Sequence, residues 1–163
     1  MKDDDLWILA IDPGIKSLGY AFYNTSGKWG PCSILSAKDL IGIGRAWGPV
    51  IKHLPRTRIR FIDVLIYENL PIINKKVALL LQATVGISIG VWCADGRLHK
   101  NALIDSVTPQ EWAKFAGVSS LRGDERKTGA YEFAKTLVPA LAVKDGADAI
   151  VIAAYAAQKL LAD

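Results

Sequence analysis

The chain has 163 residues, of which 51% are hydrophobic and 22% are charged. This length supplies one ordinary domain with a sizeable core, and it excludes sites that need a cleft between two full domains. The excess of 20 Lys and Arg over 16 Asp and Glu, a formal charge of +4, permits an anionic partner without requiring one.

The cysteine and histidine pattern predicts neither a disulfide framework nor a zinc site. Cys32 and Cys93 have no CxxC partner, and His53 and His99 do not stand at zinc-ligand spacing from them. The chain begins with three consecutive aspartates, at 3–5, instead of the positive segment that opens a signal peptide. We therefore expect a cytoplasmic protein.

The first half of the chain predicts four strands and one helix. Apolar runs of strand length lie at 6–11, 18–23, 29–35 and 61–67. Tight turns join the first three, which favours an antiparallel meander, and Pro31 places the third strand at an edge or a bulge. Between the meander and the fourth run, residues 38–54 predict a helix that ends by Pro55.

Residues 77–94 form an uncharged stretch that approaches the length of a membrane span. Polar residues and glycines interrupt it, at Gln82, Thr84, Gly86, Ser88 and Gly90. This pattern favours a buried helix that continues into another buried element, in preference to a membrane segment.

The second half of the chain alternates strand and helix. Residues 102–107 predict a fifth strand, and Thr108, Pro109 and Glu111 have the order of a helix start closed by a capping box. Two further helices are expected, at 124–137 and from Gly146 to the C-terminus. Over residues 1–163 we predict a single α/β domain with a mixed sheet, antiparallel in strands 1–3 and parallel afterwards, flanked by helices.

Acidic residues follow two of the predicted buried strands. Asp12 and Glu68 each end such a strand, where an apolar residue would be expected, so two carboxylates point to one edge of the sheet. Asp145 and Asp148 lie three residues apart at the start of the last helix and, if that turn is helical, share one face. Taken singly, Asp12 before Pro-Gly is better explained as a turn residue, and Asp148 as a helix N-cap.

Taken together, the four acids predict a metal site. Carboxylates brought close repel one another and destabilise the fold unless a divalent cation neutralises them, and Mg²⁺ accepts oxygen ligands. Two such ions about 4 Å apart bind a bridging phosphate, one activating a water for in-line attack and the other stabilising the leaving oxygen. The predicted reaction class is phosphodiester hydrolysis.

The segments around these acids form a recognisable set: Ile11-Asp12-Pro13-Gly14 with Leu18-Gly19-Tyr20-Ala21, then Ile66-Tyr67-Glu68, then Asp145-Gly146-Ala147-Asp148-Ala149. In order and spacing, along nearly the whole chain, they resemble the RuvC family of Holliday-junction resolvases. The resemblance implies a ribonuclease H-like fold, a homodimer and magnesium-dependent paired nicking of four-way DNA junctions, the activity of a crossover junction endodeoxyribonuclease. By position, Asp12, Glu68, Asp145 and Asp148 look like the family's catalytic, metal-binding carboxylates, with two Mg²⁺ ions per site and Mn²⁺ as a substitute.

Six basic residues near the acidic segments are candidates for phosphate contacts: Lys75, Lys76, Lys114, Arg122, Arg126 and Lys127. In the RuvC family a lysine precedes the glycine loop before the last-but-one helix, and the nearest candidates here are Trp112 and Lys114. A second family lysine corresponds to Arg126 or Lys127. An ordinary solvated surface explains the basic clusters equally well, because Asp124 and Glu125 dilute the second one.

In proteins that this chain resembles, the helix after the catalytic Glu lies at the dimer interface. The uncharged stretch 77–94 suits such a role, with Leu79, Leu80 and Ala83 as candidate contacts. The family often carries an aromatic residue after that Glu, which wedges into the junction, whereas this chain has Leu70-Pro71-Ile72-Ile73.

Three other functions share part of the pattern. Sugar kinases and actin-like ATPases have a similar Asp-x-Gly turn, but their nucleotide sites need two such domains, so no nucleotide cofactor is expected. RNA-processing nucleases similar to the YqgF family share the opening motif and differ in the last acidic pattern. A catalytically inert junction-binding protein is less consistent with four intact carboxylates. We therefore predict a metal-dependent nuclease of branched DNA with no membrane segment.

Overall fold

One mixed sheet of five strands forms the centre of the protein. The computed structural model describes residues 5–54, 59–71, 74–141 and 146–162. The strands are β1 (Trp7–Pro13), β2 (Ser17–Asn24), β3 (Trp29–Ser36), β4 (Ile62–Glu68) and β5 (Leu98–Val107), and they lie in the order β3-β2-β1-β4-β5. The β1–β2 and β2–β3 pairs are antiparallel, while β1–β4 and β4–β5 are parallel. The mixed sheet expected from the sequence is confirmed.

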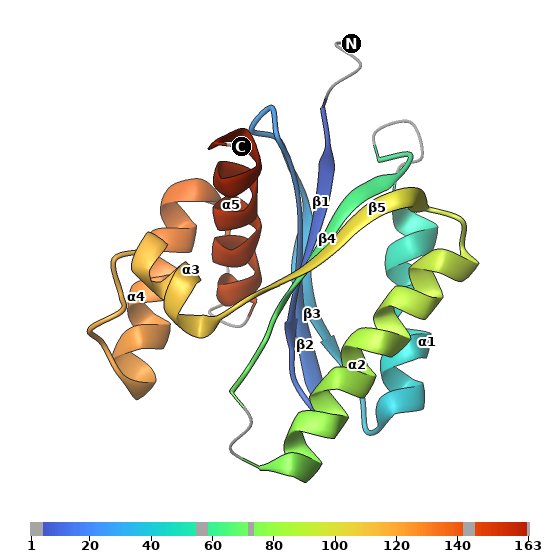
Figure 1. Cartoon of the computed structure of the whole chain (residues 1–163), viewed down its shortest axis with the longest axis horizontal. Coiled ribbons are helices and arrows are strands. Elements are labelled where there is room, and N and C mark those ends of the chain that lie inside the picture. The colour runs from blue at the N-terminus through green and yellow to red at the C-terminus, as the bar shows by residue number, and fades with distance from the viewer. Residues whose placement is uncertain (1–4, 55–58, 72–73, 142–145, 163) are drawn as a thin grey trace.

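Helices cover both faces of this sheet. They are α1 (Leu40–His53), α2 (Lys75–Ala94), α3 (Pro109–Phe115), α4 (Gly123–Leu137) and α5 (Ala147–Ala162). Figure 1 shows α1 and α2 on one side of the sheet and α3, α4 and α5 on the other. Each layer has its own hydrophobic core, the first built around Trp47 and Trp92 and the second around the apolar face of α5.

The alternation of side chains along a strand decides which helical layer each residue meets. In β1, Ile8 and Ala10 belong to the core under α5, whereas Leu9 and Ile11 belong to the core under α1 and α2. The same period of two runs through β4, which pairs with β1 in parallel register. It also fixes the face toward which the last residue of each strand points.

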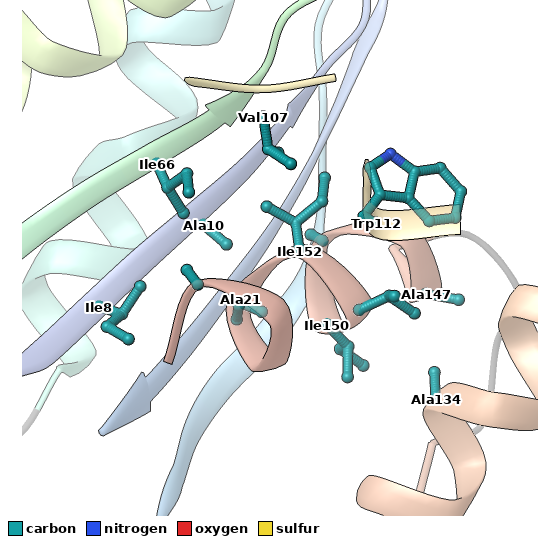
Figure 2. Close-up of a cluster of buried hydrophobic side chains, with 14 of the residues drawn as sticks. Ile8, Ala10, Ala21, Ile66, Val107, Trp112, Ala134, Ala147, Ile150 and Ile152 are labelled. Carbon is teal, nitrogen blue, oxygen red and sulfur yellow. The ribbon is translucent and has the colours of Figure 1, made fainter. Parts of the chain in front are cut away.

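Helix α5 lies close to the sheet because both surfaces carry small side chains. Figure 2 shows Ala10 and Ala21 of the sheet beside this helix. The approach is closest where the helix begins, since a Cβ atom added to Gly19 of β2 would lie 3.3 Å from Cα of Gly146. Gly146 has a φ of +87°, and a Cβ there would lie 3.3 Å from the carbonyl oxygen of Ser33. The positive φ favours glycine at position 146, and a side chain at position 19 would have to push the helix start back by a few tenths of an ångström.

The structure corrects the sequence prediction for α2. Residues 75–94 form one continuous helix, not a buried helix that continues into another buried element. Its buried residues lie on one face: Thr84, Val85, Ser88 and Trp92. Other apolar side chains, such as Leu79, are exposed, because only one face of the helix meets α1 and the sheet. The fifth strand also begins earlier than expected, at Leu98.

Within the described residues, α2 is also the one helix long and apolar enough to cross a membrane. This is weak evidence for a membrane segment, because core helices of soluble proteins pass the same test of length and composition. Here α2 packs against α1, with the rings of Trp47 and Trp92 5.4 Å apart and Trp47 Nε1 donating to Ser88 Oγ at 3.0 Å. The helix is thus part of the fold around the sheet.

Two local predictions are confirmed. The strand that contains Pro31, β3, lies at the edge of the sheet, and its pairing with β2 is irregular between Ala21 and Tyr23. The capping box is present at the start of α3: Thr108 Oγ1 accepts from the Glu111 backbone, and Glu111 Oε2 accepts from the Thr108 backbone at 2.7 Å. The first turn of this short helix is therefore held in place.

Replacing Gly19 by Val is expected to push the start of α5 away from the sheet and to destabilise the protein by about 1–3 kcal/mol, the usual cost of overpacking a tight contact. Urea unfolding followed by circular dichroism measures the change. The control is Gly48→Ala in α1, where an added Cβ meets nothing within 4 Å and no loss of stability is expected. Equal stability of Gly19→Val and the wild type would show that this contact is loose.

Candidate active site

Asp12 and Glu68 are neighbours across the β1–β4 pair. Ile11 pairs with Tyr67 in the parallel register, and the next residues on the two strands are these acids. Because side chains alternate along each strand, both acids point to the face that α5 covers. A side-chain hydrogen bond joins their carboxyl groups. The structure thus brings together the two acids that end predicted strands.

Asp148 reaches the same place from α5. It lies in the first turn of the helix, two residues after Gly146. Gly146 would be touched by any side chain at Gly19, and Gly19 pairs with Asp12 across β1 and β2. The negative charge of Asp148 acts on both Asp12 and Glu68. The fourth predicted acid, Asp145, lies outside the described residues.

The three acids hold their charges at a cost. Burial raises the pKa of Asp12 well above its ordinary value, and repulsion by Glu68 and Asp148 raises it further. Burial also raises the pKa of Glu68 and of Asp148. Three carboxylates at the edge of one sheet therefore favour either a shared proton or a bound cation.

Asp12 and Asp148 line a polar cavity of about 540 Å³, which we call the Asp12 cleft. Its walls come from β1, β2, β3, α4 and the start of α5, and they include Gly14, Ser17, Ser36, Asp124, Lys127 and Thr128. The positive charge of Lys127 lowers the pKa of both Asp12 and Asp148, against the effect of burial. The cleft thus combines acids with a facing cation, which suits a phosphate group.

Glu68 lines a second cavity, of about 530 Å³, between the loop after β4, α2 and α3. Trp112 Nε1 of α3 donates to Glu68 Oε1 at 2.7 Å. The guanidinium carbon of Arg126 lies 4.9 Å from the centroid of the Trp112 ring, and Arg126 lines the same cavity. The hydrogen bond and the charge of Arg126 both lower the pKa of Glu68, although burial outweighs them.

The other four predicted DNA contacts line neither the Asp12 cleft nor the cavity beside Glu68. Lys75 and Lys76 are exposed in the first turn of α2, and Lys114 is exposed on α3. Arg122 is exposed, and its Nη1 donates to the backbone carbonyls of Ser119 and Leu121 within its own loop. Of the six basic candidates, the structure sets Arg126 and Lys127 beside the acids and the other four on the surrounding surface.

The donors of the site suit a hard divalent cation. Asp12, Glu68 and Asp148 offer oxygen ligands, which Mg²⁺ and Mn²⁺ prefer. Their burial and mutual repulsion are costs that a cation would offset. In the described ranges, no three Asp, Glu, His or Cys side chains already stand at the spacing of a metal site. The acids fit the ion in the chemistry of their oxygen donors, although their spacing is not that of a formed metal site.

Sequence reasoning missed three features of the site. The sequence offers Trp112 as a possible counterpart of a family lysine, yet it is the hydrogen-bond donor to Glu68. Asp124 was treated as a residue that dilutes a basic cluster, yet it lines the Asp12 cleft. Gly19 belongs to the recognised pattern, but only the structure shows that its lack of a side chain lets α5 begin beside Asp12. No local sequence signal distinguishes Trp112 from the other four tryptophans.

No protein-family model matches the sequence, and no curated protein matches it significantly. Solved structures do match. Thermus thermophilus RuvC superposes with a TM-score of 0.67 at 15% identity, over 96% of this chain and 97% of that one. The chain has the RuvC fold. The ribonuclease H-like architecture expected from the sequence is thereby confirmed.

Two further solved structures are similar. Thermus thermophilus RuvC in complex with a Holliday junction substrate gives a TM-score of 0.66 at 15% identity, over 94% of this chain and 96% of that one. The yeast mitochondrial Holliday junction resolvase gives 0.49 at 16% identity, over 93% and 78% of the two chains.

Replacing Asp12 by Asn is expected to raise the Tm of the metal-free protein at pH 7 by about 2–4 °C, or about 1 kcal/mol for a chain of this size. The ionised Asp12 destabilises the fold because its pKa is raised above the unfolded value of about 3.9. This cost is fully present above the raised pKa and disappears as the pH falls toward the unfolded value. The difference in Tm between variant and wild type should therefore be largest at neutral pH and vanish near pH 4.

Thermal unfolding in EDTA between pH 4 and pH 8 measures this difference. The control is Glu132→Gln on the exposed side of α4, which should change stability by less than about 0.5 kcal/mol at any pH. A Tm difference for Asp12→Asn that does not depend on pH would contradict the prediction.

Proposed function

We propose that this chain is one nuclease domain that nicks branched DNA, with four-way junctions as the preferred substrate, in a reaction that needs a divalent cation. The observation that carries the proposal is the convergence of Asp12, Glu68 and Asp148 from β1, β4 and α5 at one edge of the sheet. The shared fold supports it, since one of the matching structures is a RuvC in complex with a Holliday junction substrate. The activity proposed is that of a crossover junction endodeoxyribonuclease.

Mg²⁺ is the proposed cofactor, with Asp12, Glu68, Asp148 and Asp145 as its ligands and Mn²⁺ as a substitute. When bound, a pair of such ions supplies Lewis-acid activation of the attacking water and charge stabilisation on the leaving oxygen. The protein's own part is to hold the carboxylates together against their repulsion. Pairing of β1 with β4 fixes Asp12 beside Glu68, and the glycine contact under α5 fixes Asp148.

Lys127 is the proposed partner of the scissile phosphate. It is exposed, it lines the Asp12 cleft, and its charge acts on Asp12 and Asp148. A flexible ammonium group follows a phosphate that moves during in-line displacement. A Cβ at Gly14 would overlap the carbonyl oxygen of Ser17, so the turn after β1 that lines the cleft requires glycine there. Lys75, Lys76, Lys114, Arg122 and Arg126 remain proposed contacts of the DNA arms.

The proposed active form is a homodimer that pairs through α2. The outward side of this helix carries Leu79, which is 57% exposed, and Leu80 and Ala83 lie half-buried next to it. Gly86 and Gly90 have open space where a Cβ would point, so a second helix can approach closely along this side. A two-fold dimer presents two active sites to the two equivalent strands of a junction. We place this activity in the cytoplasm, away from the membrane.

The wild-type protein with Mg²⁺ is expected to nick a synthetic four-way junction at symmetric positions. Asp12→Asn should reduce nicking to the level seen in EDTA, because it removes an oxygen ligand and one negative charge, while junction binding is retained. Denaturing gels of end-labelled junctions measure nicking, and gel shifts in EDTA measure binding. Glu132→Gln, exposed on α4, serves as the control with full activity. Full nicking by Asp12→Asn, or by the wild type in EDTA, would disprove the metal-dependent mechanism.

The same assay on forks, flaps and structured RNA separates the remaining alternatives. Preferential cleavage of RNA would favour an RNA-processing nuclease similar to the YqgF family. Binding of junctions without cleavage in either Mg²⁺ or Mn²⁺ would favour an inert junction-binding protein.

Leu79→Glu is expected to convert the dimer into monomers, because a charge in an apolar interface cannot be solvated. Light scattering coupled to size-exclusion chromatography measures the mass. The matched control is Leu161→Glu, since Leu161 is 69% exposed on α5, which lies on the opposite side of the sheet from α2 (Figure 1). A wild-type monomer, or a Leu79→Glu protein that remains dimeric, would rule out pairing through this side of α2.

A further inference from the structure

One buried tryptophan makes a contact with the proposed metal site that core packing does not require. Trp112 is 1% exposed, and its Nε1 donates to Glu68 Oε1 at 2.7 Å. Figure 2 shows the ring nitrogen on the edge turned away from Ala134 and Ala147. The ring therefore packs in the core of the α5 layer, while its N–H edge points out of that core to the Glu68 carboxylate.

A second tryptophan shows that the fold does not need an acceptor for every buried indole. Trp92 of α2 is completely buried in the other core, and its Nε1 has no hydrogen-bond partner among the described residues. Burying a tryptophan does not by itself produce a bond such as the one to Glu68. Trp112 and Trp92 can also be compared directly by mutation, since replacing either one by Phe removes the same atoms from a buried side chain.

The position of the indole is fixed by the backbone of α3. The Thr108–Glu111 capping box holds the first turn of this seven-residue helix. Tyr155 Oη of α5 donates to Glu111 Oε1 at 3.3 Å, which ties the same turn to the helix that carries Asp148. At the other end, Gly117 turns the chain with a φ of +71°. The Trp112 nitrogen is therefore a donor of fixed position relative to the sheet.

Arg126 restrains the Trp112 indole by lying over the face of its ring. Its guanidinium lies 4.9 Å from the ring centroid, a distance at which a planar cation is attracted to the face of an indole. Arg126 and Glu68 line the same cavity, and the charge of Arg126 also acts on Asp148. Arg126 thus contacts Trp112 and lines the cavity beside Glu68, whereas its neighbour Lys127 lines the Asp12 cleft.

We propose that Trp112, held by Arg126, is a positioning residue that fixes the Glu68 carboxylate so that Oε2 stays turned toward Asp12 and the divalent cation. Without the hydrogen bond to Oε1, repulsion by Asp12 and Asp148 would drive the Glu68 side chain away from them. This inference rests on the proposed function, because it assigns Glu68 to the metal site. Groups that orient metal ligands typically change metal affinity by about 10–100-fold when they are replaced.

The test compares Trp112→Phe with Trp92→Phe. Isothermal titration with Mn²⁺ in the absence of DNA is expected to show binding weakened by about 10-fold or more in Trp112→Phe and unchanged within about twofold in Trp92→Phe. Thermal unfolding in EDTA shows whether the two variants lose similar stability. If Trp112 had a purely structural role, a loss of stability would be the only difference between Trp112→Phe and the wild type. Equal Mn²⁺ affinities in the two variants would overturn the positioning role.

A double-mutant cycle tests whether Trp112 acts through Glu68. In a Glu68→Gln background, Trp112→Phe should cause no further loss of Mn²⁺ affinity, whereas independent effects would multiply and contradict the proposal. Arg126→Lys keeps the charge, and with it the proposed contact to DNA, but loses the planar stacking group, so it should weaken Mn²⁺ binding in the absence of DNA. Unchanged Mn²⁺ affinity in Arg126→Lys would overturn the part of Arg126 in holding Trp112.

The two proposals fail in different ways. If the wild type binds Mn²⁺ but cuts no nucleic acid, the nuclease function is wrong, and the Mn²⁺ titrations still decide the role of Trp112. If the wild type does not bind Mn²⁺, the positioning role is overturned as well.

Discussion

The rest of the site depends on the contact between α5 and β2, where Gly19 and Gly146 meet without side chains. Any Cβ at Gly19 would lie 3.3 Å from the backbone of Gly146, so a larger residue would lift the start of the helix. Asp148 follows two residues later and would move with it. Since Gly19 is paired with Asp12, this one contact determines both how α5 packs on the sheet and how far Asp148 lies from Asp12.

The acids repel one another, and two cations of one neighbouring helix, α4, offset part of that repulsion. Arg126 and Lys127 are consecutive in α4, and their charges act on Glu68 and Asp148 and on Asp12 and Asp148, respectively. Two cations against three described acids leave the site short of positive charge. Burial raises the pKa values of the three carboxyl groups more than this imbalance does, and a divalent cation would offset both costs.

Much of the fold was predictable because its strands are apolar runs bounded by turn residues. The capping box at Thr108 and the edge position of β3 follow from local sequence rules, and both are present. The convergence of Asp12 and Glu68 was predictable as well, since both end parallel strands that the sheet places side by side. The exposure of α2 was not, because an uncharged stretch of residues has no polar face from which its orientation can be inferred.

The parts of the site that could not be predicted are those made by tertiary contact alone. Trp112 is separated from Glu68 by 44 residues, and no spacing rule links an indole to a carboxylate at that distance along the chain. The same holds for Asp124, whose place in the Asp12 cleft depends on how α4 is rotated about its own axis. Sequence patterns show how often apolar residues recur along a helix or strand. These contacts depend instead on how each helix is rotated about its axis relative to its neighbours.

The rotation of α4 about its axis limits which insertions and deletions the protein can accept during evolution. Successive residues of a helix are about 100° apart, which is why Arg126 and Lys127 serve two different cavities from adjacent positions. Inserting or deleting one residue before them in α4 would rotate both cations together and leave each cavity facing the wrong group. A change in the length of the loop between α3 and α4 need not have this effect, because a loop can absorb it without rotating the helix. Single substitutions at the two positions are separable, but an insertion or deletion in the helix acts on both cavities at once.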